Sequence, residues 1–97
     1  MKTGEIENQK LAEMYKLLSV GMNPKKCHEV FYGAEIIGKI ASQKGCTVVI
    51  DIGSGIGYLS STLALKHNLN VIGLERKQDL NISAEERMNT LKNWNEP

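Results

Sequence analysis

Three glycines at alternate positions, Gly53, Gly55 and Gly57, have the residue type and spacing best suited to ligand binding in this sequence. Because glycine lacks a Cβ atom, a glycine turn lets backbone N–H groups approach a ligand closely, above all beside a helix N-terminus. A β-branched run that is apolar almost throughout, residues 47–52, precedes the glycines, and a helix-compatible stretch, residues 58–63, follows them. The pattern predicts a strand, a glycine turn and a helix, although the triplet alone is a weak signal and depends on its context.

Two acidic residues near the predicted turn narrow the choice of ligand. Glu75 closes the next apolar run, 22 residues after Gly53, where an acid can accept hydrogen bonds from the ribose hydroxyls of a nucleoside. A polar residue after a strand is also common without any function, but a place at the carboxyl end of an adjacent strand favours the ribose role. Asp51 would repel a buried pyrophosphate and would favour a ligand with a cationic amino-acid end, or it would orient the turn.

Position 58 argues against two common nucleotide sites. The dinucleotide fingerprint G-x-G-x-x-G/A requires a small residue there, and the sequence has Tyr58. A nucleoside-triphosphate loop requires Lys followed by Ser or Thr after its last glycine, and Tyr58 and Leu59 follow Gly57. The sequence therefore disfavours an NAD-dependent oxidoreductase and a triphosphate-binding enzyme.

The segments before the turn are expected to be two helices. Apolar residues between positions 5 and 19 fall at helical spacing and predict a helix that Thr3 caps and Gly21 ends. Asn23 followed by Pro24 is typical of a helix start, so a second helix should run to about residue 43. Its expected buried residues are Val30, Phe31, Ala34, Ile37, Ile40 and Ala41. Gly33 and Gly38 inside it indicate close packing against another element.

The segments around and after the turn predict a βαβ unit. The run 47–52 lacks the alternation of a half-exposed strand, so it is expected to be buried on both faces of a parallel sheet. A helix over 58–67 should connect it to a second strand over 71–75. Residues 76–82 are expected to be a polar connection. Ser83 and Glu86 then match a capping box that starts a last helix, with Met88, Leu91 and Trp94 facing inward.

Lys25 and His28 lie in the first turn of the predicted second helix. Lysines at a helix N-terminus oppose the macrodipole, which favours acids there. Composition alone favours a solvated first turn, in which the charge is merely tolerated. The functional alternative is that this turn faces an anionic group.

The residues of the turn resemble those of a known enzyme class. The segment D-I-G-S-G-I-G, residues 51–57, resembles the D-x-G-x-G-x-G motif of class I S-adenosylmethionine-dependent methyltransferases. A narrower similarity, to the methyltransferase-like protein 25 family, lies in M-N-P-K-K-C-H-E-V (22–30) and V-I-D-I-G-S-G-I-G-Y-L-S (49–60). It covers roughly residues 22–87, and the two motifs together are far more specific than a lone glycine turn.

This resemblance implies S-adenosylmethionine as the cofactor, with Asp51 serving its methionine amino group, directly or through water, and Glu75 holding its ribose. In this fold the helix before the first strand borders the methionine end, so Lys25 and His28 become candidates for the carboxylate or the substrate side. The implied cofactor-binding residues are Lys25, His28, Asp51, Gly53, Ser54, Gly55, Gly57, Tyr58 and Glu75. Neither a catalytic base nor a methyl acceptor is identified.

The expected fold class is α/β: a Rossmann-like βαβ unit with flanking N-terminal helices, forming an incomplete class I methyltransferase sheet. Residues 1–21 would be an N-terminal helix and residues 22–97 a partial S-adenosylmethionine-binding domain. A full domain of this class has a larger sheet, so a truncated chain, inactive on its own, is expected. The alternative is a non-catalytic Rossmann-like binding or scaffold remnant.

Composition adds several expected absences. The net charge is +1 over 97 residues, which is no signal for nucleic acid. Cys27 and Cys46 lack the spacing of a disulfide framework or a zinc site, so no metal site is expected. No apolar run is long enough to span a membrane, and no secretory signal is visible. A cytoplasmic location is predicted, with a nuclear one as the alternative.

Overall fold

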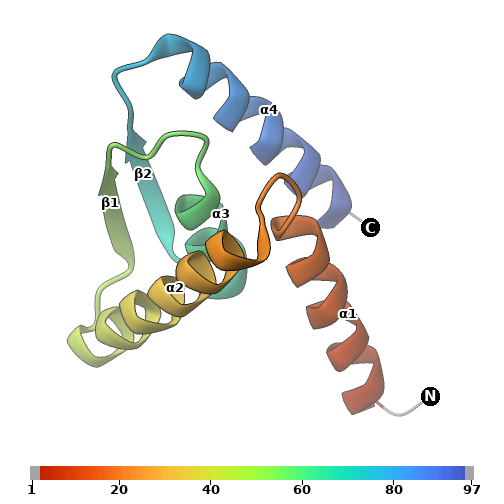
Figure 1. The fold of residues 1–97 in the computed structure, drawn as a ribbon. Helices are drawn as coiled ribbons and strands as arrows, with labels where there is room; N and C mark the ends of the chain where they lie inside the picture. The colour runs from red at the N-terminus through yellow and green to blue at the C-terminus, as the bar shows by residue number, and fades with distance from the viewer. Residues whose placement is uncertain (1–2, 96–97) are drawn as a thin grey trace.

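The computed structural model describes residues 3–95, in which helices pack on one side of a small parallel sheet (Figure 1). Their order is α1 (Thr3–Leu18), α2 (Pro24–Lys44), β1 (Val48–Ile52), α3 (Tyr58–Lys66), β2 (Asn70–Leu74) and α4 (Gln78–Asn95). The mixed α/β class that the sequence predicts is therefore confirmed.

β1 and β2 pair in parallel, as a βαβ unit requires. Their register aligns Val48 with Asn70 and Ile52 with Leu74, so both strands end at the same edge of the sheet. α3 connects them and packs against β2 and α2. This register brings the glycine turn, which follows β1, beside Glu75, which follows β2.

One face of the sheet is exposed, so the prediction of a strand buried on both faces is wrong. Alternate residues of β1 and β2 share this face. Their exposed fractions are Val48 52%, Ile50 60%, Ile52 82%, Ile72 51% and Leu74 51%. Asp51 and Val49 on the opposite face are half-buried. An apolar run shows that a strand tolerates burial on both faces, but within residues 3–95 no helix covers the second face.

The predicted ends of α2 are confirmed. The Asn23 side chain accepts a hydrogen bond from the backbone N–H of Lys26 at 2.8 Å, and Pro24 is the first helical residue. Gly45 ends the helix with φ of 68°. Val30, Ala34 and Ala41 are buried as expected. Ile40 is exposed, in contrast to the prediction, because it shares a face with exposed Ile36 that no described element covers.

The two glycines inside α2 behave differently. A Cβ atom on Gly38 would lie 2.5 Å from Nδ1 of His67, so the predicted close packing is confirmed there. At Gly33, nothing lies within 4 Å of the same position, and the prediction is wrong. Burial, and then the charge of Lys66, lower the pKa of His67, which favours the neutral ring against Gly38.

The core lies where α1, α2 and α4 meet the βαβ unit. Leu18, Leu63 and Leu91 are fully or almost fully buried there. Leu11 in α1 is exposed, because only the C-terminal end of that helix packs against the rest (Figure 1). The buried hydroxyls of Ser61 and Thr62 both donate to the carbonyl of Tyr58, so their burial leaves no lost hydrogen bond.

α4 begins at Gln78, six residues before Ala84, the first helical residue that the sequence indicates. Ser83 does not cap it but lies inside it, where its hydroxyl donates to the Asp79 carbonyl at 3.1 Å. Asp79 in the first turn suits the helix dipole, so the polar connection expected over 76–82 continues as helix from Gln78. The inward position of Leu91 is confirmed, and that of Trp94 concerns a side chain outside the described part.

Candidate functional site

The glycine turn has the local structure that its sequence predicts. Gly53 donates its N–H to the Leu74 carbonyl at 2.7 Å, which ties the start of the turn to the end of β2. The φ angles of Gly53, Gly55 and Gly57 are 70°, 58° and 90°, all in the left-handed region that favours glycine. The turn then runs directly into α3 at Tyr58.

Two of the three glycines face open space. A Cβ atom at Gly53 or Gly55 would meet nothing within 4 Å, whereas one at Gly57 would meet Ala84 of α4 at 3.7 Å. Packing within the chain therefore gives no reason for glycine at Gly53 or Gly55. Their backbone conformation gives one reason, and the room that they leave for a ligand gives a second.

Glu75 lies against the turn, as its spacing predicts. Its Oε1 accepts the N–H of Gly55 at 2.9 Å and its Oε2 accepts the N–H of Lys77 at 3.0 Å. The hydrogen bonds from Lys77 and then Gly55 lower the pKa of this carboxyl. Each carboxylate oxygen can accept a second hydrogen bond, so these contacts leave Glu75 able to bind hydroxyl groups as well.

Asp51 lies on the sheet face that α3 covers. Its Oδ2 accepts a hydrogen bond from the Ser60 hydroxyl at 2.7 Å, which fixes the carboxylate beneath the turn. Gly73 is its partner on β2, and a Cβ there would lie 2.8 Å from Oγ of Ser54. The predicted residues Asp51 and Ser54 are thus close to the same strand ends. Sequence reasoning missed Ser60 and Gly73, because their roles depend on helix and strand packing.

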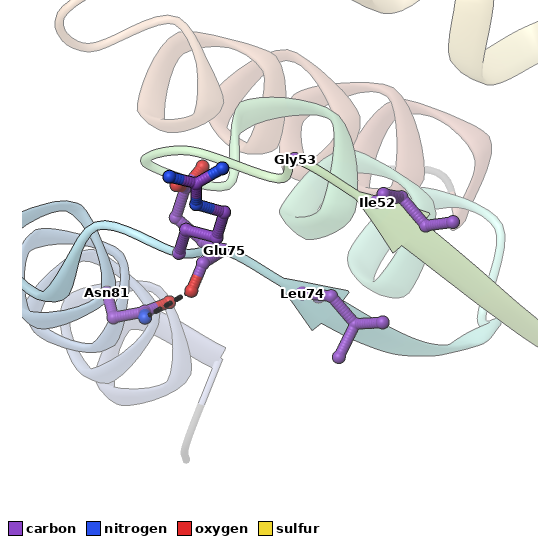
Figure 2. A pocket seen from close by; sticks show the side chains of 7 residues that line it. Ile52, Gly53, Leu74, Glu75 and Asn81 are labelled. Carbon is purple, nitrogen blue, oxygen red and sulfur yellow. Dashed lines mark hydrogen bonds between the residues drawn. The ribbon is translucent and has the colours of Figure 1, made fainter.

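An open pocket of about 460 Å³ lies at the carboxyl ends of the strands (Figure 2). Its lining residues are Ile52, Gly53, Gly73, Leu74, Glu75, Arg76 and Asn81. Apolar side chains come from the strand ends, and polar ones from the segment that follows β2. Asn81 donates to the backbone carbonyl of Glu75 at 2.8 Å, which holds the chain after β2 in place. The sequence places Asn81 in a connection without structure, so neither it nor Arg76 was predicted.

Tyr58 points away from this pocket. Its hydroxyl donates to the Gly21 carbonyl at 3.2 Å, and the guanidinium carbon of Arg87 lies 4.7 Å from the centre of its ring. Lys25 and His28 are exposed, and His28 stacks on Tyr32 with ring centres 6.1 Å apart. Within residues 3–95, no hydrogen bond or ion pair joins either of them to the glycine turn. The structure therefore gathers Asp51, Glu75 and the turn, but it does not bring Lys25 and His28 to them.

Two further features of the described chain bear on the choice of function. Residues 3–95 contain no group of three or more His, Cys, Asp or Glu side chains placed to hold a metal ion. Within the same part of the chain, no helix combines the length and hydropathy needed to cross a bilayer.

Comparison with known proteins finds a family profile and curated relatives that resemble this chain. Residues 25–97 match the profile of a family described as "Methyltransferase domain". The chain is 45% identical over 86 residues to human "Probable methyltransferase-like protein 25" and 43% identical over 86 residues to the mouse protein of that name. Each alignment covers 89% of this chain but 14% of the relative, so the chain spans a small part of their length. No solved structure gives a significant match.

Proposed function

Because the chain belongs to the methyltransferase-domain family, we propose that its glycine turn and Glu75 bind S-adenosylmethionine, on a class I fold. The observation that carries this proposal is the 2.9 Å hydrogen bond between the N–H of Gly55 and the carboxylate of Glu75. It brings the two parts of a nucleoside site, an open glycine turn and a ribose-binding acid, to the same edge of a parallel sheet. Methyltransferases generally use this cofactor.

The pocket residues suggest how the nucleoside would bind. Glu75 would accept hydrogen bonds from the ribose hydroxyls with the lone pairs that Gly55 and Lys77 leave available. Ile52 and Leu74 would offer apolar surface beside it. Gly53 and Gly55 would let the backbone approach, since no atom of residues 3–95 fills the space that a Cβ atom would take there.

The methionine part of the cofactor would be held by Asp51, on the sheet face that α3 covers. Asp51, oriented by Ser60, would receive the ammonium group, directly or through water. Ser54 would contribute from within the turn, and Tyr58 would act by fixing where α3 begins. Lys25 and His28 stay proposals for the carboxylate or acceptor side, without support from a contact to the turn.

The bound cofactor would supply a sulfonium methyl group, which transfers to a nucleophile by in-line displacement. The residues described here would bind and orient that group, and correct placement of donor and acceptor accounts for much of the rate of such reactions.

The chain spans 14% of the length of its relatives, and the described residues identify neither a methyl acceptor nor a catalytic base. We propose that residues 22–97 hold part of the cofactor-binding domain, preceded by a helix within residues 1–21. A cytoplasmic or nuclear location stays a prediction.

A binding module without transferase activity is the second candidate. The exposed apolar face of the sheet favours it, because aliphatic side chains that no described element covers form a surface suited to binding another protein. Both candidates predict cofactor binding by the turn if the site is intact. They differ in whether a methyl group is transferred.

The binding proposal is tested by isothermal titration of the chain with S-adenosylmethionine and, separately, with NAD. Gly55→Arg should abolish heat with S-adenosylmethionine, because the side chain would fill the open space of the turn. Gly45→Arg is a matched control: Gly45 also has a positive φ, 68°, and a Cβ atom there would meet no described atom within 4 Å, but it lies at the other end of β1. Both variants should lose about 1 kcal/mol of stability from left-handed strain, and only Gly55→Arg should lose binding. Binding of NAD instead, or equal loss in both variants, would refute the proposal.

A further inference from the structure

Arg87 of α4 joins two segments that are far apart in the sequence. Its Nη2 donates to the carbonyl of Leu18, in the last turn of α1, at 2.9 Å. Its guanidinium lies over the ring of Tyr58, 4.7 Å from the ring centre. Tyr58 in turn donates to the carbonyl of Gly21 at 3.2 Å. We call this set of contacts the Tyr58–Arg87 clamp.

The clamp is specific in shape and charge. Leu18 is the last residue of α1, and the helix dipole gives carbonyls at this end partial negative charge, which favours a cation such as Arg87. Gly21 has φ of 89°, and a Cβ atom there would lie 2.6 Å from the Tyr58 hydroxyl, so the chain after α1 fits closely around Tyr58. Burial lowers the pKa of Arg87, and its buried Nε has no hydrogen-bond partner among residues 3–95. The clamp is therefore held at some cost in desolvation.

The position of the clamp connects it to the proposed cofactor site. Tyr58 immediately follows Gly57, the last residue of the glycine turn. Gly21 lies two residues before Asn23, which caps α2. The clamp therefore ties the end of the glycine turn to the start of α2, whose first turn holds Lys25 and His28, while Arg87 itself does not line the pocket.

We propose that Arg87 is a positioning residue that acts through Tyr58. The Tyr58–Arg87 clamp holds the glycine turn in its binding conformation and couples it to the α1–α2 junction, residues 19–23. The effect on cofactor affinity rests on the function proposed above, whereas the coupling between the two segments does not. A purely stabilising Arg87 would instead support all parts of the fold alike.

Hydrogen exchange of the ligand-free chain separates these two roles. Arg87→Met keeps much of the length of the side chain and removes its charge. The amide exchange rate should therefore rise about tenfold at residues 53–57 and 19–23, as expected for the loss of a hydrogen bond to a charged group. The C-terminal half of α2, around Ala41, should not change. Lys92→Met is the matched control, because Lys92 is an exposed residue of the same helix and should leave exchange unchanged. Tyr58→Phe removes only the hydrogen bond to Gly21 and keeps the ring, so it should raise the exchange rate of the same residues by a smaller factor.

Titration with S-adenosylmethionine then measures whether the clamp affects cofactor affinity. If the wild-type chain binds, Arg87→Met should raise Kd about tenfold and Lys92→Met should not. Unchanged exchange at residues 53–57, or an equal rise over the whole chain, overturns the inference whatever the wild type binds. A selective rise in a chain that does not bind S-adenosylmethionine refutes the proposed function and leaves the coupling standing.

Discussion

Glu75 combines a structural contact with the binding role that we propose for it. In the ligand-free chain its carboxylate accepts hydrogen bonds from the N–H groups of Gly55 and Lys77. Bonds to an ionised acceptor are stronger than those between neutral groups, so Glu75 also holds the turn in shape. A substitution at this position therefore changes the conformation of the turn as well as the groups offered to a ribose.

Glu75→Gln tests this dual role. The amide keeps one accepting oxygen, loses the second and carries no charge, so exchange at Gly55 should quicken and cofactor affinity should fall. The wild-type pKa is lowered, so the contribution of Glu75 to stability is present above its ordinary pKa of 4.5 and is lost as the pH falls through the lowered value. Urea unfolding of both chains at neutral pH and below pH 4.5 checks this. The difference in stability should shrink in acid, and a constant difference would contradict the expectation.

α2 and α3 depend on one close approach. The ring of His67, just after α3, occupies the space that a side chain at position 38 of α2 would need. The spacing of the helices beneath the glycine turn is therefore set by a glycine well away from the turn. α4 also stabilises the site region through two hydrogen bonds: Asn81 donates to the carbonyl of Glu75, and Arg87 donates to the carbonyl of Leu18 at the end of α1.

Gly38→Ala and Gly33→Ala form a matched pair within α2. The first places a Cβ atom 2.5 Å from the His67 ring and should cost about 1–3 kcal/mol by overpacking. The second meets nothing within 4 Å and should stabilise the helix by about 0.5–1 kcal/mol, since alanine is the better helix former. Thermal unfolding followed by circular dichroism measures both. Similar effects for the two substitutions would mean that α2 and α3 do not pack as described.

At the scale of the whole molecule, the sheet is covered on one face. The core lies on the α3 side, where Leu63 is fully buried, while the aliphatic side chains of the other face remain in contact with solvent. Exposed apolar patches of this kind are typical of surfaces that bind other proteins. Burial thus divides the aliphatic residues of the βαβ unit into two energetic classes.

Leu63→Ala and Ile52→Thr should reveal these classes. Removing the buried Leu63 side chain should cost about 2–5 kcal/mol, whereas Ile52, which is 82% exposed, should change stability by at most about 0.5 kcal/mol. Chemical unfolding of dilute samples gives both values. A large loss for Ile52→Thr would show that this face is covered in solution.

The features predicted correctly from sequence are local ones. Asn23 and Gly45 mark the ends of α2, the glycines mark the turn, and Glu75 directly follows the second strand, which ends at Leu74, one residue earlier than the sequence indicates. The caps and the turn depend on backbone chemistry within a few neighbouring residues. The family resemblance was visible for the same reason, since its motifs are short and contiguous.

The features that were missed all act through space. Ser60 reaches Asp51 from α3, Asn81 reaches Glu75 from α4, and Arg87 reaches α1 across 69 positions of sequence. The exposed sheet face was misjudged because an apolar strand looks the same whether or not another element covers it. Residue types and local spacing therefore sufficed for the turn and its acid. Packing between distant segments, which no short pattern encodes, determines how that turn is held and which surfaces remain open.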